Sequence, residues 1–379
     1  MNHKDLFYFA AQCLALDDHP EFRETIISGF STGEANPDEF IFLCDKHLVL
    51  PAIYLQFKKH DLLHIFPEEY KKHLAAIYLQ NKKRNLEILQ QTEEINLTLT
   101  AENIIPVYLK GTANLLDNVY SDIGERMIGD IDLLVNDTDY LKSAGLIMQL
   151  RYQTDGKAFY DVTTSKHYPR LFRPDVPADI EIHRVPVNIE FSKQFNSEII
   201  FQNKKQTPDK VNCFVPSDEH KAIHNFIHAQ LSNLGYGFKQ TPLRDLYDMY
   251  LLSKRIAATS LISKAEEKRK ITTYLIFTNR IFGTGSIPEI KESRTTRRYI
   301  KIHDWFLEHR KIHRWYILTI KLHEVVIVRF FRGIGKVFVA KSWASFFTHI
   351  TNPGWYKMVN YRINNFYRNY ISKNKTHSV

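Results

Sequence analysis

The sequence contains few cysteines and no long hydrophobic segment. Its three cysteines, Cys13, Cys44 and Cys213, lie far apart and form no C-x-x-C pair, which excludes a zinc knuckle and a disulfide framework. This cysteine usage is typical of a reducing cytoplasm. The polar start of the chain predicts no signal peptide. The most apolar stretch, residues 315–331, is interrupted by charged residues, so we expect no membrane-spanning helix.

Basic residues are concentrated at the C-terminal end. The net charge of the 379 residues is +9, but residues 291–379 alone carry 18 Lys and Arg against 4 Asp and Glu. That segment therefore has a balance of +14, and the preceding 290 residues have −5. The basicity belongs to a tail, whereas the overall composition is that of an ordinary globular protein.

Hydrophobic periodicity divides the chain into four parts. Residues 1–100 are predicted to be helical, with an apolar stripe from Leu74 that is long for one helix. Short apolar runs rich in β-branched residues follow, and the helical period returns after Pro216. We therefore expect an α+β fold, in which a small mixed β-sheet core is flanked by N-terminal and C-terminal helical regions. The predicted parts are residues 1–100, 101–215, 216–290 and 291–379.

Two aspartates, Asp130 and Asp132, alternate with apolar residues in the run D-I-D-L-L-V. In a strand, residues two apart share a face, so both carboxylates point the same way. Adjacent carboxylates repel each other unless a cation lies between them. Mg²⁺ commonly takes one or two carboxylates together with substrate phosphates. A D-x-D pair alone is more often surface decoration, but its apolar continuation and its neighbouring motifs favour a metal site.

A third carboxylate lies on a later predicted strand, D-I-E-I-H at residues 179–183. Its alternation places Asp179, Glu181 and His183 on one face and two isoleucines on the other. Glu181 is the preferred third carboxylate because it lies in the middle of the strand, and Asp179 is the alternative. His183 is interpreted either as part of the site or as a half-buried strand histidine.

A glycine turn precedes the aspartates. Residues 104–109 form a short apolar run in which Pro106 marks roughly where a strand begins, and Lys110-Gly111-Thr112 follows before the next helix. The order strand, glycine turn, helix directs backbone N–H groups toward a phosphate. Lys110 beside this turn is either a phosphate contact or a surface lysine.

These motifs resemble those of an uncharacterised bacterial nucleotidyltransferase family of the DNA polymerase β-like superfamily. The family pattern is L-K-G, then R-P-M-G-D-I-D-L-L-V, then a strand ending in D/E-x-H. The chain has L-K-G at 109–111, R-M-I-G-D-I-D-L-L-V at 126–135 and E-I-H at 181–183, with M-I where the family has P-M. The resemblance covers roughly residues 35–255, and the middle motif is its most specific part.

The resemblance implies an enzyme that transfers a nucleoside monophosphate from an NTP, such as ATP, and releases pyrophosphate. It implies Mg²⁺ as the cofactor, with Mn²⁺ as the alternative ion. The implied metal ligands and catalytic residues are Asp130, Asp132 and Glu181. The expected nucleotide-binding residues are Lys110, Gly111, Thr112, Arg126 and His183. Arg126 has a second interpretation, in which it pairs with Asp130.

The sequence does not identify the acceptor. We expect a hydroxyl or phosphate group on a small molecule, a saccharide or a protein. The alternative function is that of a catalytically inactive nucleotide- or polyanion-binding protein with the same fold.

Histidines and an ion pair mark the helices after the sheet. His220, His224 and His228 recur every four residues and therefore share one helix face. Without an H-E-x-x-H motif or a nearby cysteine, a zinc site is disfavoured, and His228 is interpreted as a structural or substrate-pocket residue. Arg244 and Asp248, four apart on the following helix, are expected to form an intrahelical ion pair.

In the basic tail, aromatic residues from Trp305 to Tyr356 interleave with lysine and arginine. We interpret it first as a helical subdomain with inward aromatic side chains and solvated cations. Peripheral contact with an anionic membrane is the next alternative, and nucleic acid is the least favoured partner. The protein is thus expected to be cytoplasmic, with membrane association through the tail as the variant.

Overall fold

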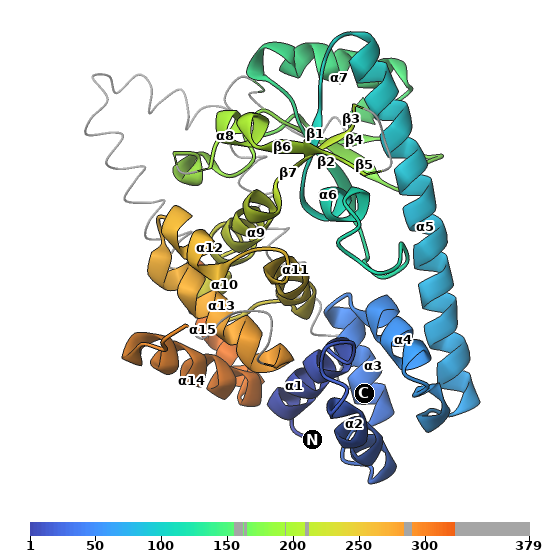
Figure 1. The fold of residues 1–379 in the computed structure, drawn as a ribbon, viewed down its shortest axis with the longest axis vertical. Coiled ribbons are helices and arrows are strands. Elements are labelled where there is room, and N and C mark those ends of the chain that lie inside the picture. The colour runs from blue at the N-terminus through green and yellow to red at the C-terminus, as the bar shows by residue number, and fades with distance from the viewer. Residues whose placement is uncertain (155–161, 163–164, 194, 209–211, 284–289, 323–379) are drawn as a thin grey trace. The chain divides into compact units, whose positions relative to one another are not determined.

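The structure, a computed structural model, describes residues 1–154, 162, 165–193, 195–208, 212–283 and 290–322. Contacts divide the chain into two compact units, residues 1–310 and residues 311–379. The first unit contains the sheet and every described helix up to α14 (Figure 1). Helix α15 (Arg310–Leu322) starts at the boundary and is the described element of the second unit.

Four short helices begin the chain: α1 (His3–Leu14), α2 (Phe22–Ser31), α3 (Pro37–Lys46) and α4 (Leu50–Lys59). Asn2 caps α1 and Asn36 caps α3, since each side chain accepts a hydrogen bond from a backbone N–H of the first turn. The aromatic rings of Phe7, Phe40 and Phe57 are fully buried in the core between these helices. The helical prediction for this region is confirmed.

Helix α5 (Glu68–Ala101) is one helix of 34 residues, so the long stripe that starts at Leu74 belongs to a single element. Part of its buried face is polar. The Asn81 side chain donates to the carbonyl oxygens of Gly124 and Arg126, at 2.8 and 3.1 Å, and Asn85 donates to the same Arg126 oxygen at 2.7 Å. The helix therefore holds the loop that leads into the D-x-D strand.

The sheet has seven strands in the order β3-β4-β5-β2-β1-β7-β6. Their bounds are β1 (Val107–Tyr108), β2 (Asp130–Leu134), β3 (Gln153–Thr154), β4 (Leu171–Phe172), β5 (Asp179–His183), β6 (Lys204–Gln206) and β7 (Phe214–Pro216). Strand β2 runs parallel to β5 and antiparallel to β1, whereas β1 runs parallel to β7. The sheet is therefore mixed. Helices precede it and follow it along the chain, which confirms the α+β prediction.

Two of the short apolar runs between residues 101 and 215 have different outcomes. The run at residues 167–172 pairs as a strand only at its end, in β4, while His167 forms an isolated bridge with His183. The run at residues 158–162 lies outside the described residues except for Val162.

Helices cover both faces of the sheet (Figure 1). Helix α6 (Lys110–Leu116) packs on β2, and α7 (Tyr140–Gln149) packs on β5 and α5. A short helix, α8 (Ser197–Gln202), precedes β6. Helix α7 follows the D-x-D strand and is preceded by a 3-10 turn at Asp137–Asp139.

The segment after the sheet is helical again. Its elements are α9 (Asp218–Phe226), a π-helix at Ile227–Ser232, α10 (Gly235–Phe238), α11 (Leu243–Ser253), α12 (Ala258–Lys264), α13 (Lys268–Phe282) and α14 (Arg294–Glu308). Ser217 caps α9, because its hydroxyl accepts the backbone N–H of His220. Helix α9 packs against both α6 and α11, which brings this helical layer to the strand ends.

The basic tail is described only through Leu322, so the aromatic residues predicted there from Phe330 to Tyr356 lie outside the described residues. In α14, the side chains of Tyr299 and Phe306 are buried in the first unit. Within the described ranges, every helix is either too short or too polar to cross a lipid bilayer.

Candidate metal centre and nucleotide pocket

Strands β2 and β5 bring the predicted carboxylates together. Their parallel register places Asp130 beside Asp179 and Asp132 beside Glu181. His183 follows two residues after Glu181 and therefore lies on the same face. The alternation of each strand had predicted this shared face, and the register turns two separate faces into one continuous polar surface.

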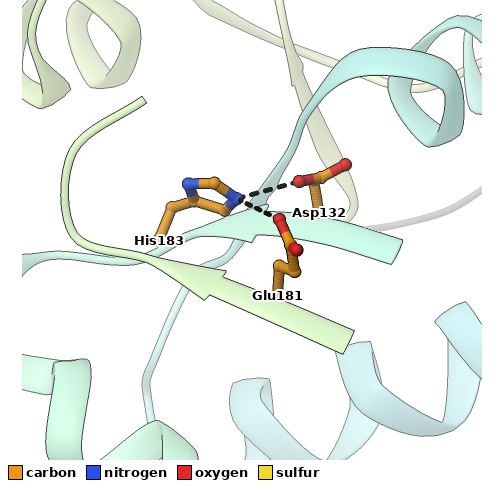
Figure 2. Close-up of side chains that lie close together, drawn as sticks. All are labelled: Asp132, Glu181 and His183. Carbon is orange, nitrogen blue, oxygen red and sulfur yellow. Dashed lines mark hydrogen bonds and ion pairs between the residues drawn. The ribbon is translucent and has the colours of Figure 1, made fainter. Parts of the chain in front are cut away.

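Asp132, Glu181 and His183 form the core of this surface (Figure 2). His183 Nε2 lies 2.8 Å from Asp132 Oδ1 and 3.6 Å from Glu181 Oε2. Each side chain offers one ligand atom, and these atoms all lie within 4.8 Å of one another. Among the described residues, this is the one group of three or more such side chains that is compact enough to hold a metal ion.

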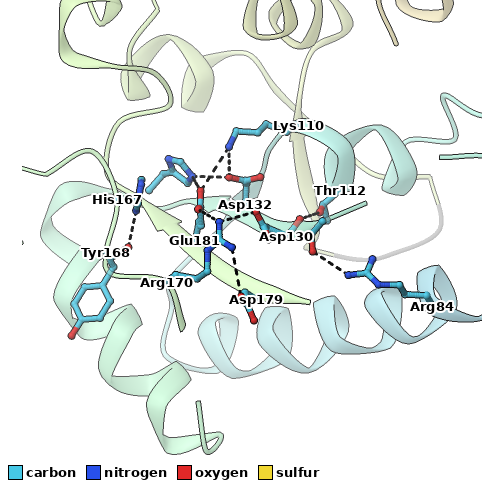
Figure 3. Close-up of polar contacts among 12 residues, drawn as sticks. Arg84, Lys110, Thr112, Asp130, Asp132, His167, Tyr168, Arg170, Asp179 and Glu181 are labelled. Carbon is cyan, nitrogen blue, oxygen red and sulfur yellow. Dashed lines mark hydrogen bonds and ion pairs between the residues drawn. The ribbon is translucent and has the colours of Figure 1, made fainter. Parts of the chain in front are cut away.

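Two basic residues, Lys110 and Arg170, compensate the charge of the carboxylates (Figure 3). Lys110 Nζ lies 2.5 Å from Asp132 Oδ1 and 3.8 Å from Glu181 Oε2. Arg170 reaches the other side of the group, with Nη2 3.2 Å from Asp130 Oδ2 and 3.0 Å from Glu181 Oε1. The carboxylates are thus bridged by cations from two separate parts of the chain.

The environment holds two of these carboxylates in their charged form. Burial raises the pKa of Asp132, but Lys110 and the hydrogen bond from His183 outweigh burial and hold this pKa well below its ordinary value. Glu181 behaves similarly: burial opposes ionisation, yet the His183 hydrogen bond and Lys110 bring its pKa to about 2. Burial raises the pKa of Asp130 despite the nearby Arg170. Asp132 and Glu181 are therefore anionic at neutral pH.

The turn before α6 differs from the sequence-based expectation. The residue in the left-handed region is Lys110, with φ of 51°, and not Gly111. A non-glycine residue in this region is strained, and such strain is common at functional sites. The unusual backbone at Lys110 accompanies the close approach of its amine to Asp132.

Gly111 and Thr112 occupy the first turn of α6. A Cβ atom at Gly111 would meet Ile128 Cγ1 at 3.6 Å and Arg126 Nη2 at 3.8 Å, which are ordinary contacts, so packing does not require glycine there. Thr112 is fully buried, and its hydroxyl donates to the Asp130 carbonyl oxygen at 3.3 Å. Thr112 thereby attaches α6 to β2, and its predicted contact with nucleotide remains a prediction.

Arg126 pairs with Asp248 and not with Asp130. Its Nε and Nη2 donate to the carboxylate of Asp248 at 2.9 and 2.8 Å, and the Tyr120 hydroxyl donates to the same carboxylate at 2.8 Å. Both charged groups are buried. The predicted intrahelical pair between Arg244 and Asp248 is therefore wrong, because the bidentate geometry of Arg126 takes the carboxylate.

Two arginines in the site were missed by the sequence analysis. Arg170 lies just before β4 and bridges the carboxylates, but it belongs to no motif. Arg84 of α5 donates to backbone carbonyls at the entries of both acidic strands, including Gly129 at 3.2 Å and Pro177 at 2.7 Å. It fixes β2 and β5 beside each other. Only the spacing of polar residues along the α5 stripe could have indicated Arg84.

A cavity of about 210 Å³ opens next to the carboxylates. One wall comes from the sheet side, with Lys110, Gly111, Asp130 and Asp132, and the other from the helical layer of α9, the π-helix and α11. Its lining residues on the helical side are Lys221, His224, Asn225, His228, Arg244, Asp245 and Asp248, and Asn114, Arg126, Ile128 and Gly129 complete it. The pocket thus joins the acidic strands to the later helices.

The three regularly spaced histidines divide between packing and pocket. The rings of His220 and His224 pack against Phe195, with ring centroids 6.1 and 5.4 Å away. His224 and His228 line the cavity, as the substrate-pocket interpretation of His228 predicted. Burial lowers the pKa of His228, with Lys110 acting in the same direction, so this ring is neutral.

The side chains present suit a divalent cation. Asp132 and Glu181 supply anionic oxygens, and His183 supplies an imidazole nitrogen. Lys110 already places a positive charge against Asp132 and Glu181, which shows that the group accommodates a cation. Asp130 lies outside the compact group and beside it, in contact with Arg170. Two of the three predicted metal ligands are therefore in the group, together with His183, whose expected role was nucleotide binding.

The mixed sheet and its acidic, cation-bridged surface define a candidate site for metal-assisted phosphate chemistry. The chain belongs to a family described as uncharacterised nucleotidyltransferase, whose model matches residues 33–273. This match includes β2, β5 and the helical layer through α12 and the beginning of α13. The search of the curated proteins found no match.

Proposed function

We propose that this protein is a divalent-metal-dependent nucleotidyltransferase. It would transfer a nucleoside monophosphate from an NTP to a hydroxyl or phosphate acceptor and release pyrophosphate. The observation that carries the proposal is the group of Asp132, Glu181 and His183, whose ligand atoms lie within 4.8 Å of one another beside a cavity. Membership of a nucleotidyltransferase family supports the same chemistry.

Each acidic residue has a role in this proposal. Asp132 and Glu181 would hold the metal with His183, and Asp130 would be the additional carboxylate at the cavity side. A bound metal would neutralise the phosphate charge and favour departure of pyrophosphate. As the acceptor oxygen bonds to the α-phosphorus and the bond to pyrophosphate breaks, Glu181 would assist removal of the acceptor proton. Positioning and charge neutralisation would supply most of the rate.

Phosphate binding would fall to the residues at the start of α6 and around it. Lys110 lies beside the carboxylates and lines the cavity, so its amine can move from Asp132 to a phosphate when a metal takes its place. Gly111 exposes backbone on the cavity wall. Arg126 lines the cavity as well, but because it pairs with Asp248 its main role would be to stabilise the cavity wall.

Mg²⁺ and Mn²⁺ are both compatible with the carboxylates, but the imidazole distinguishes them. Mg²⁺ prefers all-oxygen coordination, whereas Mn²⁺ binds nitrogen more readily and lies above Mg²⁺ in affinity for such sites. With His183 Nε2 2.8 Å from Asp132 Oδ1, the imidazole is as close to the centre of the group as either carboxylate. We therefore propose that Mn²⁺ binds more tightly, and that Mg²⁺ serves where it is abundant.

The second candidate is a catalytically inactive nucleotide- or polyanion-binding protein. It is favoured by one observation, namely that Lys110 and Arg170 already compensate the carboxylates without a metal. A crystal grown with Mn²⁺ and a non-hydrolysable NTP separates the two functions. The enzyme requires anomalous density for Mn²⁺ at Asp132 and Glu181 with the α-phosphate beside it. A nucleotide bound away from these carboxylates, with Lys110 still on Asp132, would contradict it.

A further inference from the structure

Four basic side chains line the cavity: Lys110, Arg126, Lys221 and Arg244. Three of the four are held in close ion pairs with carboxylates. The distances are 2.5 Å to Asp132, 2.8 Å to Asp248 and 2.7 Å to Asp218, in the same order. The positive charges of Lys110, Arg126 and Lys221 are therefore largely balanced by carboxylates of the protein.

Arg244, in the first turn of α11, is the exception. Its ion pair is a single contact of 3.5 Å from Nε to Asp245 Oδ1, and the buried Nε makes no hydrogen bond. Within the part of the chain that the structure describes, its two terminal guanidinium nitrogens have no protein acceptor. The side chain is 26% exposed, so it is neither solvated like a surface arginine nor satisfied like a core one. Its donors are available to a ligand in the cavity.

The surroundings of Arg244 favour an oxyanion. His228 lines the same cavity from the π-helix, an element that often marks functional sites because it displaces a side chain from the regular helix face. As a neutral ring, it can donate one hydrogen bond. The neighbouring amide of Asn225 is fixed by the Asp245 carbonyl oxygen at 3.1 Å and by the Tyr274 hydroxyl at 2.9 Å. The side chain of Asn225 is thus held in place by the protein, whereas the nearby Arg244 guanidinium keeps donors available for a ligand.

The size of the cavity limits which part of a nucleotide it holds. About 210 Å³ is less than the roughly 300–1,000 Å³ of cavities that enclose a whole drug-sized ligand. A polyphosphate chain is compact and anionic, and it must also reach the carboxylates at the sheet side. The enclosed space therefore suits the phosphates better than the base and ribose.

We propose that Arg244 binds the two terminal phosphates of the nucleoside triphosphate, the part that leaves as pyrophosphate, with His228 as a second hydrogen-bond donor. This inference rests on the proposed function and names the phosphate subsite on the helical side of the same cavity. The planar guanidinium can donate two parallel hydrogen bonds to a phosphate, a geometry that lysine cannot reproduce. Arg244 acts in binding and positioning, and the carboxylates of β2 and β5 act at the α-phosphate.

Calorimetric titration with inorganic tripolyphosphate in the presence of Mg²⁺ tests the subsite without any turnover. Arg244→Gln should weaken tripolyphosphate binding about 10- to 100-fold, as expected for hydrogen bonds between charged partners. Arg244→Lys should recover only part of that loss. The matched control is Arg269→Gln, which removes the same charge from an exposed position on α13, and it should change binding less than about 2-fold. Circular dichroism and the thermal midpoint check that each variant is folded.

Enzyme kinetics provide a measurement that a purely structural role of Arg244 would not change. In Arg244→Gln, inhibition by added pyrophosphate should weaken in parallel with the rise in KM for the NTP, while inhibition by the nucleoside without phosphates stays unchanged. If the folded Arg244→Gln protein binds tripolyphosphate as tightly as the wild type, the subsite is overturned. It is equally overturned if the wild type binds no tripolyphosphate, even where NTP turnover is present. If tripolyphosphate binding depends on Arg244 but no NTP is turned over, the subsite stands and the proposed transferase activity fails.

Discussion

The amine of Lys110 lies 2.5 Å from Oδ1 of Asp132 and thus joins the strained turn before α6 to the acidic strand β2. Burial alone would lower the pKa of Lys110, but Asp132 raises it above its ordinary value. The two groups therefore stay charged and attract each other. A divalent metal at Asp132 and Glu181 must compete with this amine for the same carboxylate oxygens.

Replacing Lys110 by methionine should have opposite effects on metal affinity and stability. Without the competing amine, Mn²⁺ should bind more tightly, by about 10-fold or more, as titration calorimetry without nucleotide would show. The metal-free protein should lose about 3 kcal/mol in its free energy of unfolding, because a buried carboxylate loses its partner. The control is Lys166→Met, which removes a half-buried lysine that acts on Lys110, Glu181 and Asp132 only through its charge, and its gain in Mn²⁺ affinity should be much smaller. Unchanged or weaker Mn²⁺ binding in Lys110→Met would show that the amine does not compete with the metal.

Replacing His183 should alter the preference between metals. His183→Gln keeps a polar side chain on β5 but removes the imidazole nitrogen that faces Asp132 at 2.8 Å. We expect the affinity for Mn²⁺ to fall about 10- to 100-fold and the affinity for Mg²⁺ to fall less, since Mg²⁺ depends mainly on oxygen ligands. Electron paramagnetic resonance of free Mn²⁺, repeated in competition with Mg²⁺, measures both affinities. An equal loss for the two ions would remove His183 from the metal ligands.

The buried pair of Arg126 and Asp248 should matter for stability far more than an exposed pair. Asp248→Asn leaves the guanidinium without its anionic partner and should cost about 3 kcal/mol in the free energy of unfolding by urea. The comparison is Glu102→Gln, which breaks the exposed pair with Lys142 at 2.8 Å and should cost less than about 1 kcal/mol. Similar costs for the two substitutions would contradict the burial argument.

Acid should destabilise the protein partly through His47. Burial lowers the pKa of this side chain to about 4 in the folded protein, against 6.5 in the unfolded chain, and its Nδ1 accepts the backbone N–H of Leu243 at 3.1 Å. Between these two values the unfolded chain binds the extra proton, so the free energy of unfolding falls as pH is lowered from 6.5 to 4.

Urea unfolding between pH 7 and pH 4.5 measures this contribution. In His47→Gln the fall with acid should be smaller than in the wild type by about 1–2 kcal/mol, after allowance for the partial exposure of the ring. His73→Gln, at an exposed position on α5, should leave the pH dependence unchanged. Parallel curves for His47→Gln and the wild type would exclude His47 as the source.

The acidic strands were predictable because the information is local. The period of two in D-I-D-L-L-V and D-I-E-I-H fixes which side chains share a face of each strand. The pairing of Asp132 with Glu181 was not predictable from either run, because the parallel register depends on contacts made elsewhere, including those of Arg84 with the carbonyl oxygens of Gly129 and Pro177.

Long-range ion pairs account for most of what the sequence did not reveal. Arg126 and Asp248 are 122 residues apart, so spacing favoured the nearer Arg244 as a partner for Asp248. Arg170 has no motif, and its position among the carboxylates depends on the pairing of β4 with β5. A glycine turn was expected at residues 110–112, yet Gly111 lies in α6 and the left-handed backbone lies at Lys110, whose side chain gains Asp132 as a partner.

The central claim is that Asp132 supports metal-dependent nucleotidyl transfer, and pyrophosphate release tests it most directly. The wild type and Asp132→Asn would be incubated with each NTP, Mn²⁺ or Mg²⁺, and a panel of hydroxyl and phosphate acceptors. We predict that the wild type releases pyrophosphate, that EDTA stops the release, and that folded Asp132→Asn loses it at least about 1,000-fold. The same rate in Asp132→Asn as in the wild type, or no release from any NTP by the wild type, would contradict the account.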